Sequence, residues 1–177
     1  MIEVGTRQRI KIMALNIGSF WAKQKALECY INDHEVNVVI ITESNVTENS
    51  IKQVNIANFA CVNYCCRDKG AVKGGGGGGV LIFVHYTVPC VPGYNMVGNI
   101  EAEMEHCSTT LYPQYDYGMP LNIVGVYRPP VYRHPSYEEA LQRMLRDHKE
   151  KNITTIIAGD LNVTSWGKEY SEWIEVA

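Results

Sequence analysis

The chain has 177 residues, of which 46% are hydrophobic and 20% charged, and its formal net charge is −3. This length and composition suit a single domain with a real core, which we expect to cover residues 1–177. The charge argues against a strongly basic surface for tight, nonspecific binding of nucleic acid. Because no apolar run could span a bilayer and no signal-peptide core opens the chain, we expect an intracellular protein with no membrane partner.

The six cysteines do not form a metal-binding pattern. None belongs to a Cys-x-x-Cys pair, and no histidine tract accompanies them, so a zinc site is disfavoured. A disulfide framework is disfavoured as well, because no secretion signal is present. Cys65 and Cys66 are adjacent, and in a strand they would face opposite sides as buried thiols.

The first half of the chain alternates between strand and helix patterns. We expect strands at 9–16, 37–43, 59–65 and 80–84, a helix capped by Ser19 that includes Trp21 and Ile31, and a short helical or irregular segment at 48–55. The order strand, helix, strand at its start indicates an α/β domain.

Six consecutive glycines occupy positions 74–79, after the polar loop 67–73 and before the strand at 80–84. In a phosphate-binding P-loop the strand precedes the loop and a helix follows, so the order here is reversed. We therefore interpret the run as a hairpin connection that permits close backbone approach.

The second half contributes more strands. We expect antiparallel strands at 99–110 and 120–127 joined by a tyrosine-rich loop at 111–119, a helix from Ser136 to about Lys149, a strand at 154–160, and a final helix at 168–176 after Trp166. Ser136 and Glu139 have the spacing of a capping box, and the buried face of the helix should carry Ala140, Leu141, Met144 and Leu145. The strand at 154–160 is aliphatic and β-branched, which suits burial on both faces, and Gly159 should turn the backbone where a side chain would obstruct. The whole pattern favours two sheets packed on each other with helices outside.

Polar side chains stand where four of these strands end, and together they resemble a site. They are Asn16, Glu43, Tyr127, Arg128, Asp160 and Asn162. Any one alone is more often a turn former, a helix cap or a residue at the edge of a core. As a set, they offer hard oxygen ligands that suit Mg²⁺ or Mn²⁺, a carboxylate that could take a proton from water, and donors for phosphate oxygens. Hydrolysis of a phosphodiester or phosphomonoester is the chemistry that needs this set.

Four motifs carry a family resemblance: Ala14-Leu15-Asn16, Ile41-Thr42-Glu43, Val126-Tyr127-Arg128-Pro129-Pro130 and Gly159-Asp160-Leu161-Asn162. In this order they resemble the endonuclease/exonuclease/phosphatase superfamily. The Tyr-Arg-Pro-Pro form looks most like the apurinic-type endonuclease domain of non-LTR retrotransposons. The resemblance implies a four-layer α/β sandwich, a nuclear location, and Mg²⁺-dependent nicking of DNA that leaves a 3′ hydroxyl to prime reverse transcription.

The resemblance also assigns roles by position. Glu43 would be the principal metal ligand with Asn16 beside it, and Tyr127 would contact the scissile phosphate. Asp160 would activate water, and Asn162 would position both water and phosphate. Independently of the resemblance, the guanidinium of Arg128 is a candidate donor to the phosphate oxygens.

The family pattern continues past Gly-Asp-x-Asn to a Ser-Asp-His-type motif, which this sequence lacks; His134 and His148 do not replace it. We therefore expect a domain incomplete at its C-terminus, fused to a reverse transcriptase in a longer polyprotein. Two alternatives stay open. One is another superfamily hydrolase, such as a repair endonuclease, a deadenylase or a lipid phosphatase, and the other is an inactive remnant that binds metal or nucleic acid.

Overall fold

The computed structural model describes residues 9–66, 78–96, 104–112, 119–129, 136–150 and 153–162. It contains strands β1 (Ile12–Asn16), β2 (Val38–Thr42), β3 (Phe59–Cys65), β4 (Val80–His85), β5 (Cys90–Met96), β6 (Glu105–Leu111), β7 (Leu121–Tyr127) and β8 (Thr154–Asp160). The helices are α1 (Phe20–His34), α2 (Ser136–Glu150) and the 3₁₀ turn η1 (Ile51–Gln53). No helix of the described residues is long and apolar enough to cross a membrane.

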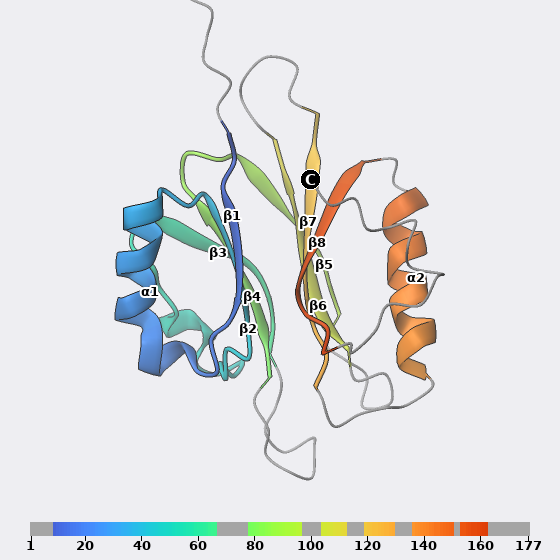
Figure 1. Ribbon diagram of the computed structural model, residues 1–177, viewed down its shortest axis with the longest axis horizontal. Coiled ribbons are helices and arrows are strands. Elements are labelled where there is room, and N and C mark those ends of the chain that lie inside the picture. The colour runs from blue at the N-terminus through green and yellow to red at the C-terminus, as the bar shows by residue number, and fades with distance from the viewer. Residues whose placement is uncertain are drawn as a thin grey trace, which may run out of the picture.

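The elements stack in four layers, as the sequence predicted. One sheet has the strand order β1-β2-β4-β3 and the other the order β5-β6-β7-β8. Figure 1 shows the two sheets face to face, with α1 covering the outer face of the first sheet and α2 the outer face of the second. Both sheets are mixed, because β1 pairs with β2 and β7 with β8 in parallel, while the other pairs are antiparallel.

Three apolar clusters fill the spaces between the four layers. The first joins α1 to the outer face of the first sheet, and the third joins α2 to the outer face of the second. The middle cluster lies between the sheets and includes Val38, Ile40, Val80, Ile82 and Ile123. Strands β2 and β4 supply side chains to two clusters each, which explains why their sequences are apolar without alternation.

The topology brings several strand ends to one end of the sandwich. In each parallel pair the two carboxyl ends lie together, with Asn16 opposite Thr42 in one sheet and Tyr127 opposite Asp160 in the other. Strands β4 and β6 run the other way and start at this end, so that Val80 pairs with Thr42. The strand ends named from the sequence therefore gather at a single edge.

Most expected elements are confirmed, and the ends of the helices differ slightly from expectation. Ser19 holds the N-cap position of α1, but its side chain makes no capping hydrogen bond. Ser136 is the first residue of α2 instead of its N-cap. The side chains of Ser136 and Ala140 are not among those that the structure describes. Of the expected buried face of α2, Leu141, Met144 and Leu145 are buried. Trp166, the helix expected at 168–176, and His134 lie outside the described residues, as does the side chain of His148.

Strand β5 was not predicted. Of the strand expected at 99–110, residues 99–103 lie outside the described part of the chain, and β6 spans Glu105–Leu111. The sequence did not indicate β5 because this strand contains Pro92 and Gly93. Proline cannot donate to a ladder, but it is tolerated at a sheet edge or a bulge. Strand β5 has both features, because it is the edge strand of its sheet and its register shifts between Pro92 and Asn95.

The prediction that the strand at 154–160 is covered on both faces is wrong. Strand β8 is the edge strand of the second sheet, and its burial pattern mixes exposed and half-buried residues. Ile156 keeps 37% of its surface exposed.

The expectations for Cys65 and Cys66 are confirmed, since each is buried in a different apolar cluster on opposite sides of the first sheet. Residues 67–77, which include most of the glycine run, lie outside the described residues. Because β3 and β4 are antiparallel neighbours, the connection between them is that of a hairpin, as expected.

Candidate functional site

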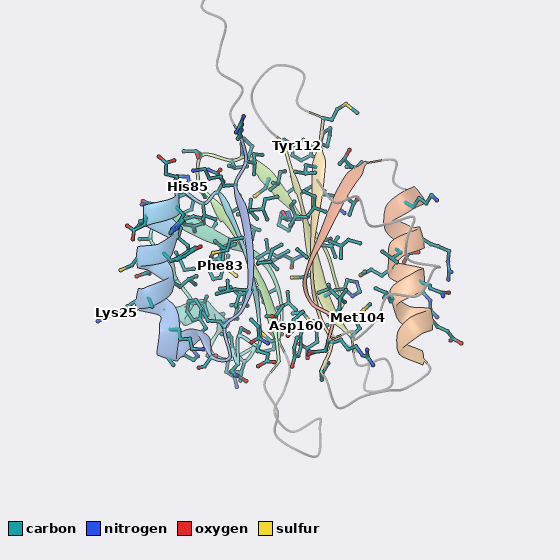
Figure 2. The ribbon with its side chains drawn as sticks, viewed as in Figure 1. Lys25, Phe83, His85, Met104, Tyr112 and Asp160 are labelled. Atoms are coloured by element: carbon teal, nitrogen blue, oxygen red, sulfur yellow. The ribbon has the colours of Figure 1, made fainter. Side chains whose placement is uncertain are left out.

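The side chains predicted from the strand ends form two hydrogen-bonded pairs that cross from one sheet to the other. Each pair joins a residue at the end of the first sheet to one at the end of the second. Figure 2 shows Asp160 at this end of the sandwich, together with Met104, while His85 and Tyr112 mark the opposite end. The structure thus brings residues far apart in the sequence to one place.

The first pair joins Asn16 to Asp160. The Nδ2 of Asn16, at the end of β1, donates to Oδ2 of Asp160 over 2.9 Å, across 144 positions of sequence. The Oδ1 of Asn16 accepts the backbone N–H of Gly18 at 3.1 Å. A backbone N–H requires an oxygen and a carboxylate requires a donor, so these two partners define the orientation of the amide.

The second pair joins Glu43 to Tyr127. The phenol of Tyr127 donates to Oε1 of Glu43 at 3.0 Å, and the tyrosine is only 2% exposed. A phenol can donate one hydrogen bond, and in this structure Tyr127 donates it to Glu43. The predicted donation from Tyr127 to a scissile phosphate therefore requires that this hydrogen bond be redirected from Glu43.

Asn162 and Arg128 tie the ends of β7 and β8 together. Asn162 donates through its backbone N–H to Oδ1 of Asp160 at 3.1 Å and through Nδ2 to the carbonyl of Arg128 at 2.7 Å. The backbone N–H of Arg128 donates in turn to the carbonyl of Asp160 at 2.9 Å. Asn162 therefore restricts the orientation of the Asp160 side chain. Both oxygens of the Asp160 carboxylate already accept a hydrogen bond.

Backbone conformations that most residues avoid cluster around this site. Glu43, Asn45 and Asn162 have φ angles of 52°, 54° and 46°. Asparagine tolerates the left-handed region better than most residues, but a glutamate there is uncommon and costs free energy. This conformation lies directly after β2, where the chain turns the Glu43 carboxylate toward the second sheet.

The prediction from sequence missed a group of residues behind the site. Glu105, at the start of β6, is 2% exposed and accepts the backbone N–H of Gly79. The carbonyls of Gly78 and Gly79 accept the N–H groups of Asn45 and Ser44 at 2.9 and 3.2 Å. Gly79 has a φ of +92°, and a Cβ there would collide with the Ser44 hydroxyl. The end of the glycine run therefore lies close to the turn at Glu43, which agrees with the expected close backbone approach, whereas nothing in the sequence indicated Glu105.

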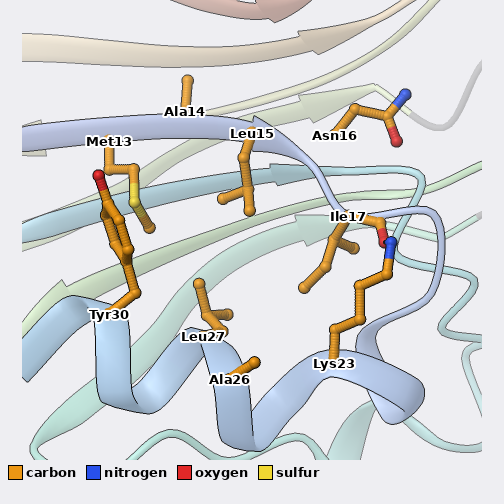
Figure 3. A pocket seen from close by; sticks show the side chains of 9 residues that line it. All are labelled: Met13, Ala14, Leu15, Asn16, Ile17, Lys23, Ala26, Leu27 and Tyr30. Carbon is orange, nitrogen blue, oxygen red and sulfur yellow. The ribbon is translucent and has the colours of Figure 1, made fainter.

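A hollow of about 470 Å³ lies next to the site, between β1 and α1. Figure 3 shows that Met13, Leu15 and Leu27 line it, with Asn16 at its end and Lys23 beside Ile17. The ammonium of Lys23 donates to the carbonyl of Ile17 at 2.6 Å. The lining is mostly apolar, and its polar side chains are Asn16, Lys23 and Tyr30, so the hollow offers no carboxylate for a metal or a general base.

Comparisons with known proteins agree with this architecture. The endonuclease domain of TRAS1, a telomere-specific non-LTR retrotransposon, matches with a TM-score of 0.56 and 14% identity, over 89% of this chain and 61% of that chain. An endonuclease/exonuclease/phosphatase family protein from Leptotrichia buccalis C-1013-b matches with a TM-score of 0.60 and 14% identity, over 88% of this chain and 67% of that one. The chain has the endonuclease/exonuclease/phosphatase fold.

This fold is shared by proteins with different names. The mannosyl-6-phosphatase Bt3783 from Bacteroides thetaiotaomicron VPI-5482 matches with a TM-score of 0.62 and 12% identity, over 94% of this chain and 70% of that one. The chain thus spans 61 to 70% of the length of these three structures. The sequence matches no protein-family model and no curated protein.

The endonuclease/exonuclease/phosphatase fold implies a divalent metal, and the donors at this edge fit Mg²⁺. Within the described residues, no group of three or more His, Cys, Asp and Glu side chains gathers around one point. Mg²⁺ does not need one, because it is held by one or two carboxylates, several waters and the phosphate of the substrate. Glu43 offers Oε2, which has no hydrogen bond within the described part of the chain, and Asp160 keeps lone pairs on both oxygens. Glu43 would hold the ion with Asn16 beside it, and the free lone pairs of Asp160 would face a water next to the ion.

Proposed function

We propose that this chain carries a metal-dependent phosphodiesterase site that nicks DNA. The observation that carries the proposal is the crossing of the two sheets by Asn16–Asp160 and Glu43–Tyr127 at 2.9 and 3.0 Å. This arrangement sets two carboxylates, an amide and a phenol at one edge, with no thiol or imidazole among them. Such a set suits phosphate chemistry and a hard cation rather than nucleophilic acyl transfer.

Asp160 is proposed as the general base. Its two oxygens each accept one hydrogen bond, from Asn16 and from the backbone of Asn162, which holds the carboxylate in one orientation. A carboxylate has about four lone-pair sites, so it can also accept a proton from an attacking water.

Glu43 is proposed as the principal metal ligand, with Asn16 beside it. Bound Mg²⁺ would neutralise charge on the scissile phosphate and stabilise the charge that develops during hydrolysis. Tyr127 holds Glu43 in place through its hydroxyl, and Tyr127 and Arg128 are the proposed donors to phosphate oxygens.

The finer proposal concerns the biological context. The retrotransposon resemblance of the Tyr127-Arg128-Pro129-Pro130 motif, together with the fold that this chain shares with the TRAS1 endonuclease domain, supports an element-encoded nuclease. We infer that the nick leaves a 3′ hydroxyl for target-primed reverse transcription, that the chain is part of a polyprotein with a reverse transcriptase, and that it acts in the nucleus.

A second candidate function is hydrolysis of another phosphate ester by the same site. The observation that favours it is the fold shared with a mannosyl-6-phosphatase. A repair endonuclease or a deadenylase would use the same carboxylates. A third candidate is a remnant that binds metal or nucleic acid without turnover.

The test starts with supercoiled plasmid, Mg²⁺ and the 177-residue chain. We expect open-circular product that a DNA polymerase extends without end processing, which reports a 3′ hydroxyl. Asp160→Ala should reduce the nicking rate by about 10²-fold or more, as is typical for loss of a general base. Glu48→Gln is the matched control, because this exposed carboxylate also follows β2 but makes no contact with the two pairs.

Two further measurements separate the alternatives. If the protein hydrolyses p-nitrophenyl phosphate but does not nick the plasmid, the site is that of a phosphatase and not of a nuclease. Mn²⁺ should selectively broaden NMR signals of residues around Glu43 and Asp160, and Glu43→Gln should weaken this effect. Broadening there without turnover of any phosphate ester favours the remnant, and broadening centred elsewhere would overturn the site itself.

A further inference from the structure

We propose that Asn45 is a positioning residue that orients Asn16 toward Asp160 through the backbone of Gly18. Three hydrogen bonds form the connection. The Nδ2 of Asn45 donates to the carbonyl of Gly18 at 2.7 Å, and the N–H of Gly18 donates to Oδ1 of Asn16 at 3.1 Å. The Nδ2 of Asn16 then donates to Asp160 at 2.9 Å. The catalytic consequence rests on the proposed function, but the geometric effect does not.

The residue type at position 45 is suited to this task. Asn45 has a φ of 54°, a conformation that asparagine and glycine adopt more readily than other residues. Its backbone N–H donates to the carbonyl of Gly78 at 2.9 Å, which fixes the turn after β2. With the backbone held in this way, the side-chain amide is directed at the loop between β1 and α1.

Gly18 is the element that transmits the contact. It has a φ of +66°, so its peptide units can turn the carbonyl toward Asn45 and the N–H toward Asn16. Because the Gly18 N–H occupies Oδ1 of Asn16, the opposite end of that amide must present its N–H₂ to the carboxylate of Asp160. Rotation of the Asn16 amide would replace a donor by an acceptor against a negative charge.

The loop has other anchors, so removal of the Asn45 amide should not unfold it. The N–H of Ile17 donates to the carbonyl of Thr42 at 3.0 Å, and the N–H of Phe20 donates to the carbonyl of Ser44 at 2.9 Å. Both bonds flank Gly18 and involve only backbone atoms. Loss of the Asn45 contact therefore frees Gly18 locally and leaves the β1–α1 connection in place.

The experiment compares two substitutions with a matched control. Asn45→Gly keeps the left-handed backbone and removes the amide, and Asn45→Asp keeps the shape but cannot donate. Asn58→Gly is the control, since Asn58 has a similar φ of 66° and accepts a hydrogen bond from the N–H of Tyr86, away from the site. In ¹H–¹⁵N NMR spectra, both Asn45 variants should move the Gly18 amide and the Asn16 side-chain amide upfield and speed their exchange with water.

Activity provides a second and independent reading. If the wild-type chain hydrolyses a phosphodiester, Asn45→Gly should lower kcat by about three- to tenfold with little change in KM, the effect of one hydrogen bond on orientation. The same substitution in an Asn16→Ala background should have a much smaller effect, because the connection through Gly18 is already cut and only the 3.5 Å contact of the Asn45 amide with the Glu43 carbonyl remains.

The outcomes distinguish this inference from the proposed function. Unchanged Gly18 and Asn16 amide signals in Asn45→Gly, or the same shifts in Asn58→Gly, would overturn the inference even in an active enzyme. A wild-type chain without activity would count against the proposed function alone, and the NMR shifts would still decide the role of Asn45. Equal losses from Asn45→Gly with and without Asn16 would also contradict it.

Discussion

Gly125 allows the two sheets to approach each other closely, and we predict that Gly125→Ala destabilises the protein. Gly125 lies in β7 and faces the first sheet. A Cβ at this position would be 2.8 Å from Cγ1 of Val80 and 2.9 Å from Cγ2 of Ile40. Both neighbours have a relative exposure of 0%, so the added methyl group cannot escape to solvent.

The size of the effect follows from these contacts. Ordinary van der Waals contact of a Cβ begins near 3.4 Å, so the methyl group is about 0.5 Å too close to two side chains. Val80 and Ile40 are β-branched and belong to central, hydrogen-bonded strands, which limits both rotation and retreat. Overpacking of this kind costs about 1–3 kcal/mol, and we expect about 2–3 kcal/mol here. For a chain of this length, that corresponds to a lower Tm by about 4–12 °C.

Thermal and urea unfolding followed by circular dichroism test this reasoning. Val80→Ala removes the nearest carbon, and Gly125→Ala combined with Val80→Ala should be at least about 1 kcal/mol more stable than the sum of the single effects. Thr154→Ala, at an exposed position of β8, serves as a control with an expected change within about 0.5 kcal/mol. An unchanged Tm in Gly125→Ala, or strict additivity with Val80→Ala, would refute the close-packing argument.

Three more predictions follow from the described contacts. Gly159→Ala should destabilise by more than about 3 kcal/mol, because Gly159 has a φ of +146° and a Cβ there would collide with the Val126 carbonyl; wild-type unfolding in urea would contradict this. Tyr127→Phe should cost about 1–3 kcal/mol, since Glu43 loses a buried donor, and an unchanged urea midpoint would show that the bond contributes nothing. Burial raises the pKa of Cys61 to about 12, so its native thiol stays protonated while the unfolded thiol ionises near pH 9. Stability should therefore be full below that pH and be lost as pH rises toward 12; Tm measured against pH should fall less steeply in Cys61→Ala, and equal slopes would rule out this thiol as a cause.

Local sequence patterns were sufficient to locate most strands and the strand-end residues. The run Thr154-Thr155-Ile156-Ile157-Ala158-Gly159-Asp160 predicted a strand that delivers a carboxylate to its end, and β8 spans these residues. The glycine before that carboxylate was expected to occupy a place where a side chain would obstruct, and the contact with Val126 confirms it. These features depend on neighbours in sequence, which is why they could be read directly.

Other features depended on neighbours in space. Strand β5 was missed because Pro92 and Gly93 weaken any strand pattern, and only its edge position with a bulge makes them acceptable. The aliphatic residues of β8 predicted burial on both faces, but an edge strand leaves Ile156 exposed. Glu105 gave no signal in the sequence, since its partner is a backbone N–H at position 79.

The sequence by itself determined the kinds of group at the strand ends and the chemistry that they suit. It did not determine that Asn16 donates to Asp160, that the Tyr127 hydroxyl donates a hydrogen bond to Glu43, or that Asn45 contacts the loop beside them. Those contacts exist because the two sheets pack face to face with these strand ends at the same end of the sandwich. The distance between the two sheets depends on close packing at Gly125. Local propensity specifies each strand, but only the packing of one sheet on the other brings residues 144 positions apart within 2.9 Å.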